Sequence, residues 1–162
     1  MDSNKNLFDF TAQDIDGKEV KFADFKGKAK AFLIVNVASA CGLTDGNYKE
    51  LTQLYTEYHP QGLEILAFPC NQFGSQEDKC NLTIKKFATD NYKVQFPIFN
   101  KIDVNGTGAT PLFSWLRSQA KIEKIGWNFA KFLVDKEGHF VSYHVHSASP
   151  LSFKDQISAL LH

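Results

Sequence analysis

The stretch Val35-Asn36-Val37-Ala38-Ser39-Ala40-Cys41-Gly42-Leu43-Thr44 places a cysteine where a predicted strand gives way to a predicted helix. It continues an apolar run from Ala31 that is typical of a buried strand. Turn residues follow, and apolar and aromatic residues then recur at helical spacing up to Tyr58. Ligands bind at this edge of open α/β sheets, and helix N–H groups favour a negative charge there. We therefore expect Cys41 to favour the thiolate, which is the nucleophilic form.

Composition limits the kinds of protein that this chain can be. The chain has 162 residues, 43% of them apolar, which suits a single domain spanning residues 1–162. Its 18 basic residues equal its 18 acidic ones, which argues against nucleic acid as a main partner. The longest apolar run is too short to cross a bilayer, and the amino terminus lacks the plan of a secretory signal. Three cysteines without a C-x-x-C pair fit a reducing compartment, so we expect a cytoplasmic protein.

The order of predicted elements indicates an α/β fold with a central mixed β-sheet flanked by helices. An N-terminal β-hairpin turns at Asp16-Gly17, a two-residue turn signal. A βαβ unit follows over 31–38, 47–58 and 63–68, and then a helix over 82–88. A strand over 94–99 is interrupted by Pro97, which implies an edge position or a strand end. The last elements are a helix capped by Thr110-Pro111, a hairpin over 129–134 and 139–145, and a helix from Ser149-Pro150.

Two further segments share the character of the Cys41 stretch, because they combine rare residues in a fixed order. They read Phe68-Pro69-Cys70-Asn71-Gln72-Phe73-Gly74-Ser75-Gln76-Glu77 and Gly126-Trp127-Asn128-Phe129-Ala130-Lys131-Phe132. With the Cys41 stretch, they resemble the three signatures of the glutathione peroxidase family, over nearly the whole chain. The resemblance implies a thioredoxin-like fold.

The resemblance also implies roles for four residues. Cys41 stands where the family has its peroxidatic cysteine or selenocysteine, and Gln76, Trp127 and Asn128 stand where it has the groups around that atom. Side-chain amides and an indole can donate N–H bonds to a thiolate or to a departing peroxide oxygen. The implied cycle oxidises Cys41 to a sulfenic acid, which two thiols then reduce. No metal, flavin, nicotinamide or other bound cofactor is implied.

The reductant stays open between glutathione and a thioredoxin-like protein. Thioredoxin-dependent members carry a resolving cysteine at the position of Thr89 here, whereas the nearest cysteine in this chain is Cys80. Cys80 lies among charged residues, so we expect it to be exposed, either as an incidental surface thiol or as the resolving thiol. Whether cysteine at position 41 is native or replaces selenocysteine also stays open.

Several other residues have structural interpretations. We expect Cys70 to be buried and Trp115 to pack in the core. His144 and His146 could both reach one metal, but an exposed strand edge is the preferred interpretation. Lys121, Lys124 and Lys131 could attract anionic headgroups or glutathione, although solvated lysines are the default.

The sequence thus predicts a thiol-dependent peroxidase of the antioxidant response that reduces hydrogen peroxide and lipid hydroperoxides. The short segment between Pro111 and Trp127 resembles that of the monomeric phospholipid hydroperoxide branch, which implies a monomer with an open site and peripheral membrane contact. The alternative is a redox sensor that passes oxidation to a partner protein. A general thiol–disulfide oxidoreductase is disfavoured by the missing C-x-x-C pair.

Overall fold

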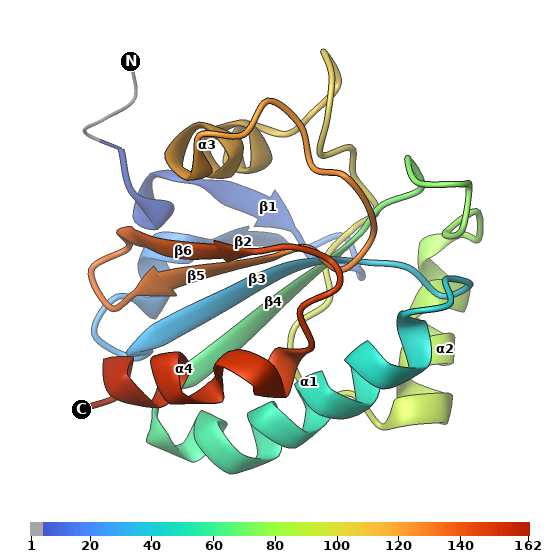
Figure 1. Ribbon diagram of the computed structural model, residues 1–162. Coiled ribbons are helices and arrows are strands. Elements are labelled where there is room, and N and C mark those ends of the chain that lie inside the picture. The colour runs from blue at the N-terminus through green and yellow to red at the C-terminus, as the bar shows by residue number, and fades with distance from the viewer. Residues whose placement is uncertain (1–4) are drawn as a thin grey trace.

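A four-stranded mixed sheet forms the centre of the protein (Figure 1). The computed structural model describes residues 5–162, so residues 1–4 of the amino terminus considered above lie outside it. The strands are β3 (Ala31–Val37), β4 (Leu63–Pro69), β5 (Lys131–Asp135) and β6 (Phe140–His144), in the spatial order β4-β3-β5-β6. β3 pairs with β4 in parallel and with β5 antiparallel, so the predicted mixed sheet is confirmed.

Helices cover both faces of this sheet. They are α1 (Thr44–Tyr58), α2 (Asn81–Tyr92), α3 (Pro111–Ala120) and α4 (Lys154–Leu160). On one side, α1 and α4 pack against the sheet, and on the other lie α3 and the predicted hairpin, formed by β1 (Thr11–Gln13) and β2 (Glu19–Lys21) (Figure 1). Each face has its own apolar core.

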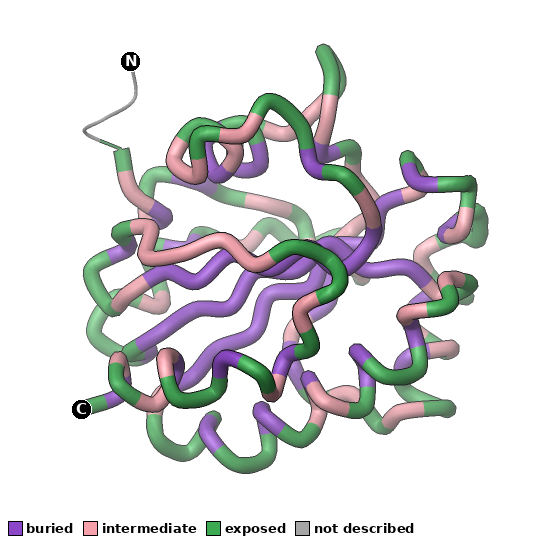
Figure 2. Tube along the Cα trace, in the orientation of Figure 1, coloured by how far each residue is buried: buried purple, intermediate pink, exposed green. Residues whose placement is uncertain are grey.

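The central strand β3 explains why both faces are covered. All its residues are buried, and Figure 2 shows the buried colour running along β3 and its neighbour β4. Successive side chains point to opposite faces of a strand. Phe32 and Ile34 accordingly pack in the core beside α3, whereas Leu33 and Val35 pack in the core beside α1. A continuous apolar run is therefore what this strand requires.

Helix boundaries differ from the predictions by a few residues. α1 begins at Thr44 rather than at position 47, and α2 continues to Tyr92 rather than ending at position 88. Thr110 caps α3 as predicted, since its side chain accepts a hydrogen bond from the Phe113 N–H. The last helix begins as a 3-10 helix over Pro150–Phe153 before α4.

The predicted strand over 94–99 is wrong, because the structure has only isolated bridges there. Ile98 forms a parallel bridge with Ala67 of β4, and Phe99 forms an antiparallel bridge with Asp14. The Pro97 carbonyl accepts a 3.1 Å hydrogen bond from the Ala67 N–H, and the Phe99 N–H donates to the Ala67 carbonyl at 2.9 Å. Proline has no N–H to continue a ladder, so the pairing stops after these two bonds.

The turn of the N-terminal hairpin is also longer than predicted. A 2.8 Å hydrogen bond from the Asp14 N–H to the Lys18 carbonyl leaves Ile15 to Gly17 in the loop. Gly17 has a φ of +88°, the left-handed conformation that three-residue hairpin loops favour. The two-residue turn prediction is therefore wrong.

Lys131 is not the solvated lysine that we expected. Its side chain is fully buried at the start of β5, opposite Val35 of β3. The Nζ atom donates hydrogen bonds to the carbonyls of His146 and Ala148, at 3.3 and 2.7 Å. Burial lowers the pKa of this amine to about 8. Lys131 therefore holds the segment after β6 against the sheet. Lys121 and Lys124 are exposed, as expected for solvated lysines.

One polar residue interrupts the apolar strand β3. Asn36 is fully buried, and its Nδ2 donates to the Trp127 carbonyl at 3.1 Å while its Oδ1 accepts from the Ala130 N–H at 3.0 Å. Its own carbonyl accepts from the N–H of Phe129, which has a φ of +66°, rare for a residue other than glycine. Asn36 thus holds the 127–130 segment against the end of β3.

We predict that Asn36→Leu, which keeps the side-chain volume, lowers the free energy of unfolding by about 2–4 kcal/mol, because a buried carbonyl and a buried N–H each lose a partner. Urea unfolding measures this loss. The exposed Asn91→Leu variant is the control and should change stability little. Equal stability of the two variants would show that the Asn36 bonds contribute nothing to folding.

Candidate active site

Three loops meet at one edge of the sheet. Val37 of β3 and Pro69 of β4 are register partners in the parallel pair, so the loops that follow them leave from the same edge. β5 runs the opposite way and begins opposite Val35, so the segment before β5 enters at that edge too. The three sequence signatures occupy these three loops, which is the position where ligands bind in α/β sheets.

Cys41 lies in the first loop, between β3 and α1, as the sequence predicted. It is half-buried, and its Sγ accepts a 3.3 Å hydrogen bond from the Leu43 N–H. Thr44 shapes the loop, since its Oγ1 accepts from the Cys41 N–H at 3.0 Å and donates to the Ala38 carbonyl at 2.7 Å. The sulfur thus lies beside the amino-terminal end of α1, where N–H groups stabilise negative charge.

Gln76 and Asn128 come together from the second and third loops. The Asn128 Nδ2 donates to the Gln76 Oε1 at 3.0 Å. The Gln76 carbonyl accepts a 3.0 Å hydrogen bond from the N–H of Ala40, the residue before Cys41. Asn128 is fully buried, and its Oδ1 has no hydrogen-bond partner within residues 5–162. The pair therefore connects all three loops and keeps one free acceptor.

Trp127 is half-buried and packs against the second loop. Its ring lies 5.9 Å from that of Phe73, measured between centroids. Gly74 has a φ of +66°, and a Cβ added there would lie 3.1 Å from the edge of the indole. A glycine at this position therefore lets the loop approach the indole closely.

The structure does not bring every predicted donor to the sulfur. In the part of the chain that is described, the side chains of Gln76, Trp127 and Asn128 form no hydrogen bond with the Cys41 sulfur, whose one such bond comes from Leu43. Gln76 contacts the Cys41 loop through its backbone, Asn128 bonds to Gln76, and Trp127 packs against the second loop. Their roles in the chemistry stay predictions.

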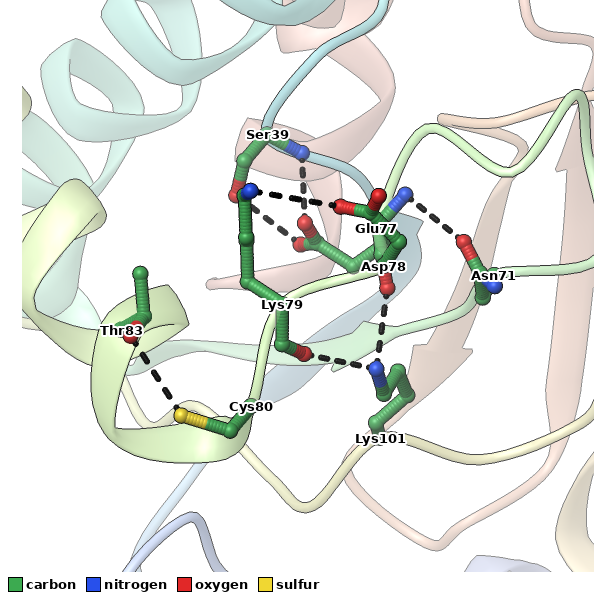
Figure 3. A network of polar contacts seen from close by, with 8 residues as sticks. All are labelled: Ser39, Asn71, Glu77, Asp78, Lys79, Cys80, Thr83 and Lys101. Atoms are coloured by element: carbon green, nitrogen blue, oxygen red, sulfur yellow. Dashed lines mark hydrogen bonds and ion pairs between the residues drawn. The ribbon is translucent and has the colours of Figure 1, made fainter.

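Sequence reasoning missed Glu77, which lies beside the same loop. Its carboxylate is 1% exposed and accepts hydrogen bonds from both the N–H and the hydroxyl of Ser39 (Figure 3). Burial raises the pKa of this carboxyl to about 6, against the hydrogen bonds from Ser39, which lower it. The available signal was an acidic residue directly after Gln76 in the second signature. Asn36 was missed likewise, although it is an amide within an apolar strand.

The other two cysteines differ sharply in their surroundings. Cys70 is buried as expected, and burial raises the pKa of its thiol. Cys80 is exposed as expected, at the amino-terminal end of α2. Its Sγ lies 3.3 Å from the Thr83 Oγ1, and this hydrogen bond lowers the pKa of the Cys80 thiol (Figure 3). All three cysteines are free thiols.

The remaining predicted positions are structural. Trp115 is buried in the core, as expected. His144 lies on the edge strand β6, where it stacks on Phe153 with ring centroids 3.9 Å apart and bonds to Gln156. Among the described residues, no group of three or more His, Cys, Asp or Glu side chains could hold a metal ion. No helix within 5–162 has the length and apolar character needed to span a membrane.

Comparison with known proteins shows which family the chain resembles. A family model described as glutathione peroxidase matches residues 7–117. A Citrus sinensis protein, "Probable phospholipid hydroperoxide glutathione peroxidase", is 52% identical over 162 residues, covering 98% of this chain and 96% of that protein. The crystal structure of T. cruzi GPX1 matches with a TM-score of 0.78 and 37% identity, covering 97% of each chain.

A more distant structure shows the fold alone. A thiol:disulfide interchange protein of the thioredoxin family from Chlorobium tepidum matches with a TM-score of 0.70 and 18% identity, over 94% of this chain and 93% of that one. The expected thioredoxin-like fold is therefore confirmed. The chain, with its three signature loops gathered at one sheet edge, belongs to the glutathione peroxidase family.

Proposed function

We propose that the protein is a thiol peroxidase that reduces hydrogen peroxide and lipid hydroperoxides through a sulfenic acid at Cys41. The observation that supports this most is the position of the half-buried Cys41 sulfur beside the start of α1, in a loop bonded to Gln76. The name of the Citrus sinensis relative supports a phospholipid hydroperoxide as one substrate.

The first step uses Cys41 as the nucleophile. The thiolate attacks one peroxide oxygen, the O–O bond breaks, and the other oxygen leaves as water or an alcohol after it takes a proton. Cys41 becomes a sulfenic acid. The amide of Gln76, the amide of Asn128 and the indole of Trp127 serve as N–H donors toward the leaving oxygen, where negative charge develops.

The second half of the cycle restores the thiolate. A thiol condenses with the sulfenic acid, which releases water and forms a disulfide, and a second thiol then frees Cys41 by exchange. The second thiol comes from glutathione or from a thioredoxin-like protein, and the first comes from the same reductants or from Cys80, as argued below. No bound cofactor takes part in this scheme.

Steady-state turnover tests the proposal. We predict that the protein consumes both hydrogen peroxide and phosphatidylcholine hydroperoxide in detergent, because Cys41 is only half-buried. Glutathione and thioredoxin are compared in parallel, each with its own reductase, and oxidation of the nicotinamide cofactor of the reductase is followed. Reduction of hydrogen peroxide without reduction of the lipid would contradict the lipid substrate.

A redox relay is the second candidate. A relay would oxidise Cys41 once and then need its client protein, so it would show no turnover with either reductant. We also propose that the protein is a monomer, that it contacts membranes peripherally and that it acts in the cytoplasm. The three free cysteines support a reducing location.

We also propose that Cys80 is the resolving thiol. Its exposure and its lowered pKa favour attack on a sulfenic acid, since the thiolate is the attacking species. Contacts between neighbouring residues support the idea, because the Cys41 loop bonds to the Gln76–Glu77 segment that leads into Cys80. The reaction would form an S–S bond between Cys41 and Cys80 and release water.

Peptide mass mapping after one equivalent of peroxide should therefore find a Cys41–Cys80 disulfide in the parent protein. In Cys80→Ser the sulfenic acid should persist at Cys41 and be trapped by dimedone. If the parent keeps a sulfenic acid at Cys41 together with a free Cys80 thiol, Cys80 is an incidental surface thiol.

A further inference from the structure

The Glu77 carboxylate joins two of the three site loops. Both of its oxygens are used, because Oε2 accepts from the Ser39 N–H at 2.9 Å and Oε1 accepts from the Ser39 hydroxyl at 3.1 Å (Figure 3). Ser39 lies two residues before Cys41 in the loop after β3. A two-point contact of this kind fixes direction as well as distance, and hydrogen bonds to an ionised acceptor are the stronger ones.

Glu77 is itself held firmly on its own side. Its N–H donates to the Asn71 Oδ1 at 3.0 Å, and its carbonyl accepts from the Lys101 Nζ at 3.1 Å (Figure 3). Lys101 also donates to the Lys79 carbonyl at 2.6 Å. The loop that carries Gln76 and Glu77 is therefore a fixed support, and the Cys41 loop is attached to it through Ser39 and Ala40.

Few charged groups face this carboxylate. Lys101 carries the opposite charge and Asp78 the same charge. Tyr48 and Cys70 also lie within electrostatic range, but burial raises the pKa of each, so both are neutral around pH 7. Ionisation of the carboxylate is thus governed by its burial, by the two Ser39 bonds and by Lys101.

We propose that Glu77 is a positioning residue for the peroxidase reaction, whose ionised carboxylate holds the Ser39–Cys41 loop in place and releases it when protonated. The inference rests on the proposed function. A protonated carboxyl loses the charge that strengthens the Ser39 bonds and gains an O–H that needs an acceptor. The loop then samples other positions, and even a small misplacement of a reacting atom slows a reaction considerably.

Ionisation of the Glu77 carboxylate does not itself stabilise the fold. Because its pKa is raised to about 6, the folded chain binds more protons than the unfolded chain between the ordinary value of about 4.3 and about 6. The contribution of Glu77 to stability therefore falls as pH rises through this window. Glu77→Gln also loses one acceptor for Ser39, so the pH profile of the rate, and not the melting temperature, separates positioning from a structural role.

The experiment measures the rate of peroxide consumption and follows the Ser39–Glu77 hydrogen bond by NMR, both between pH 5 and 8. Single-turnover consumption of peroxide is measured on the reduced parent, Glu77→Gln, Ser39→Ala and the control Glu137→Gln, which changes an exposed acid far from the site. The NMR signal of the Ser39 amide is followed over the same range, because this N–H donates to the carboxylate.

The parent should show a titration of the Ser39 amide with a midpoint near 6. The ratio of its rate to that of Glu77→Gln, in which the ionisation of Cys41 cancels, should fall about tenfold between pH 7 and 5, since roughly one carboxylate in ten stays ionised one unit below the midpoint. In Glu77→Gln the Ser39 amide signal should not titrate, and peroxide consumption should be about tenfold slower than in the parent at pH 7. Ser39→Ala should move the midpoint to higher pH, because the Ser39 hydrogen bonds lower the pKa of Glu77. Glu137→Gln should match the parent.

An active parent whose Glu77→Gln variant keeps the same rate and pH profile would overturn the inference, as would a variant that only melts earlier. A Ser39 amide that does not titrate near pH 6 would overturn it too. A parent that consumes no peroxide at any pH would instead contradict the proposed function.

Discussion

The pairing of β3 with a parallel strand on one side and an antiparallel strand on the other is the constraint on which the site depends. This arrangement sends the loops after β3 and β4 and the segment before β5 to one edge of the sheet. Sheet pairing alone brings the loops near one another but does not lock them. Buried polar groups do that: Asn36 bonds the Trp127 segment, and Glu77 bonds the Cys41 loop.

Both groups lie where burial is costly, and each is satisfied by partners from another loop. A buried amide or carboxylate without partners would destabilise the fold, so each contact favours one arrangement of the loops over others. The two groups differ in one respect. Asn36 is neutral and acts at every pH, whereas the raised pKa of Glu77 makes its contact sensitive to mild acid. The loops are therefore held by one contact that does not depend on pH, that of Asn36, and by one that does, that of Glu77.

The sequence was sufficient for the fold and for identifying the three loops that meet at one sheet edge, because continuous apolar runs mark buried strands and the three signatures are long. Sequence analysis failed where contacts with residues far along the chain determine the structure. Residues 94–99 form only isolated bridges, to β4 and to Asp14, and Lys131 is buried because the carbonyls of His146 and Ala148 accept hydrogen bonds from its Nζ. Asn36 and Glu77 looked like ordinary polar residues, since their partners lie 38 to 94 positions away. Patterns along the chain do not reveal such pairs.

The most direct test of the account concerns the Cys41 sulfur itself. Peroxide consumption by stoichiometric amounts of reduced protein is measured for the parent, for Cys41→Ser and for Cys80→Ser. The account predicts that Cys41→Ser consumes peroxide no faster than buffer, while Cys80→Ser completes the first step as fast as the parent. Peroxide consumption by Cys41→Ser at the rate of the parent would contradict it.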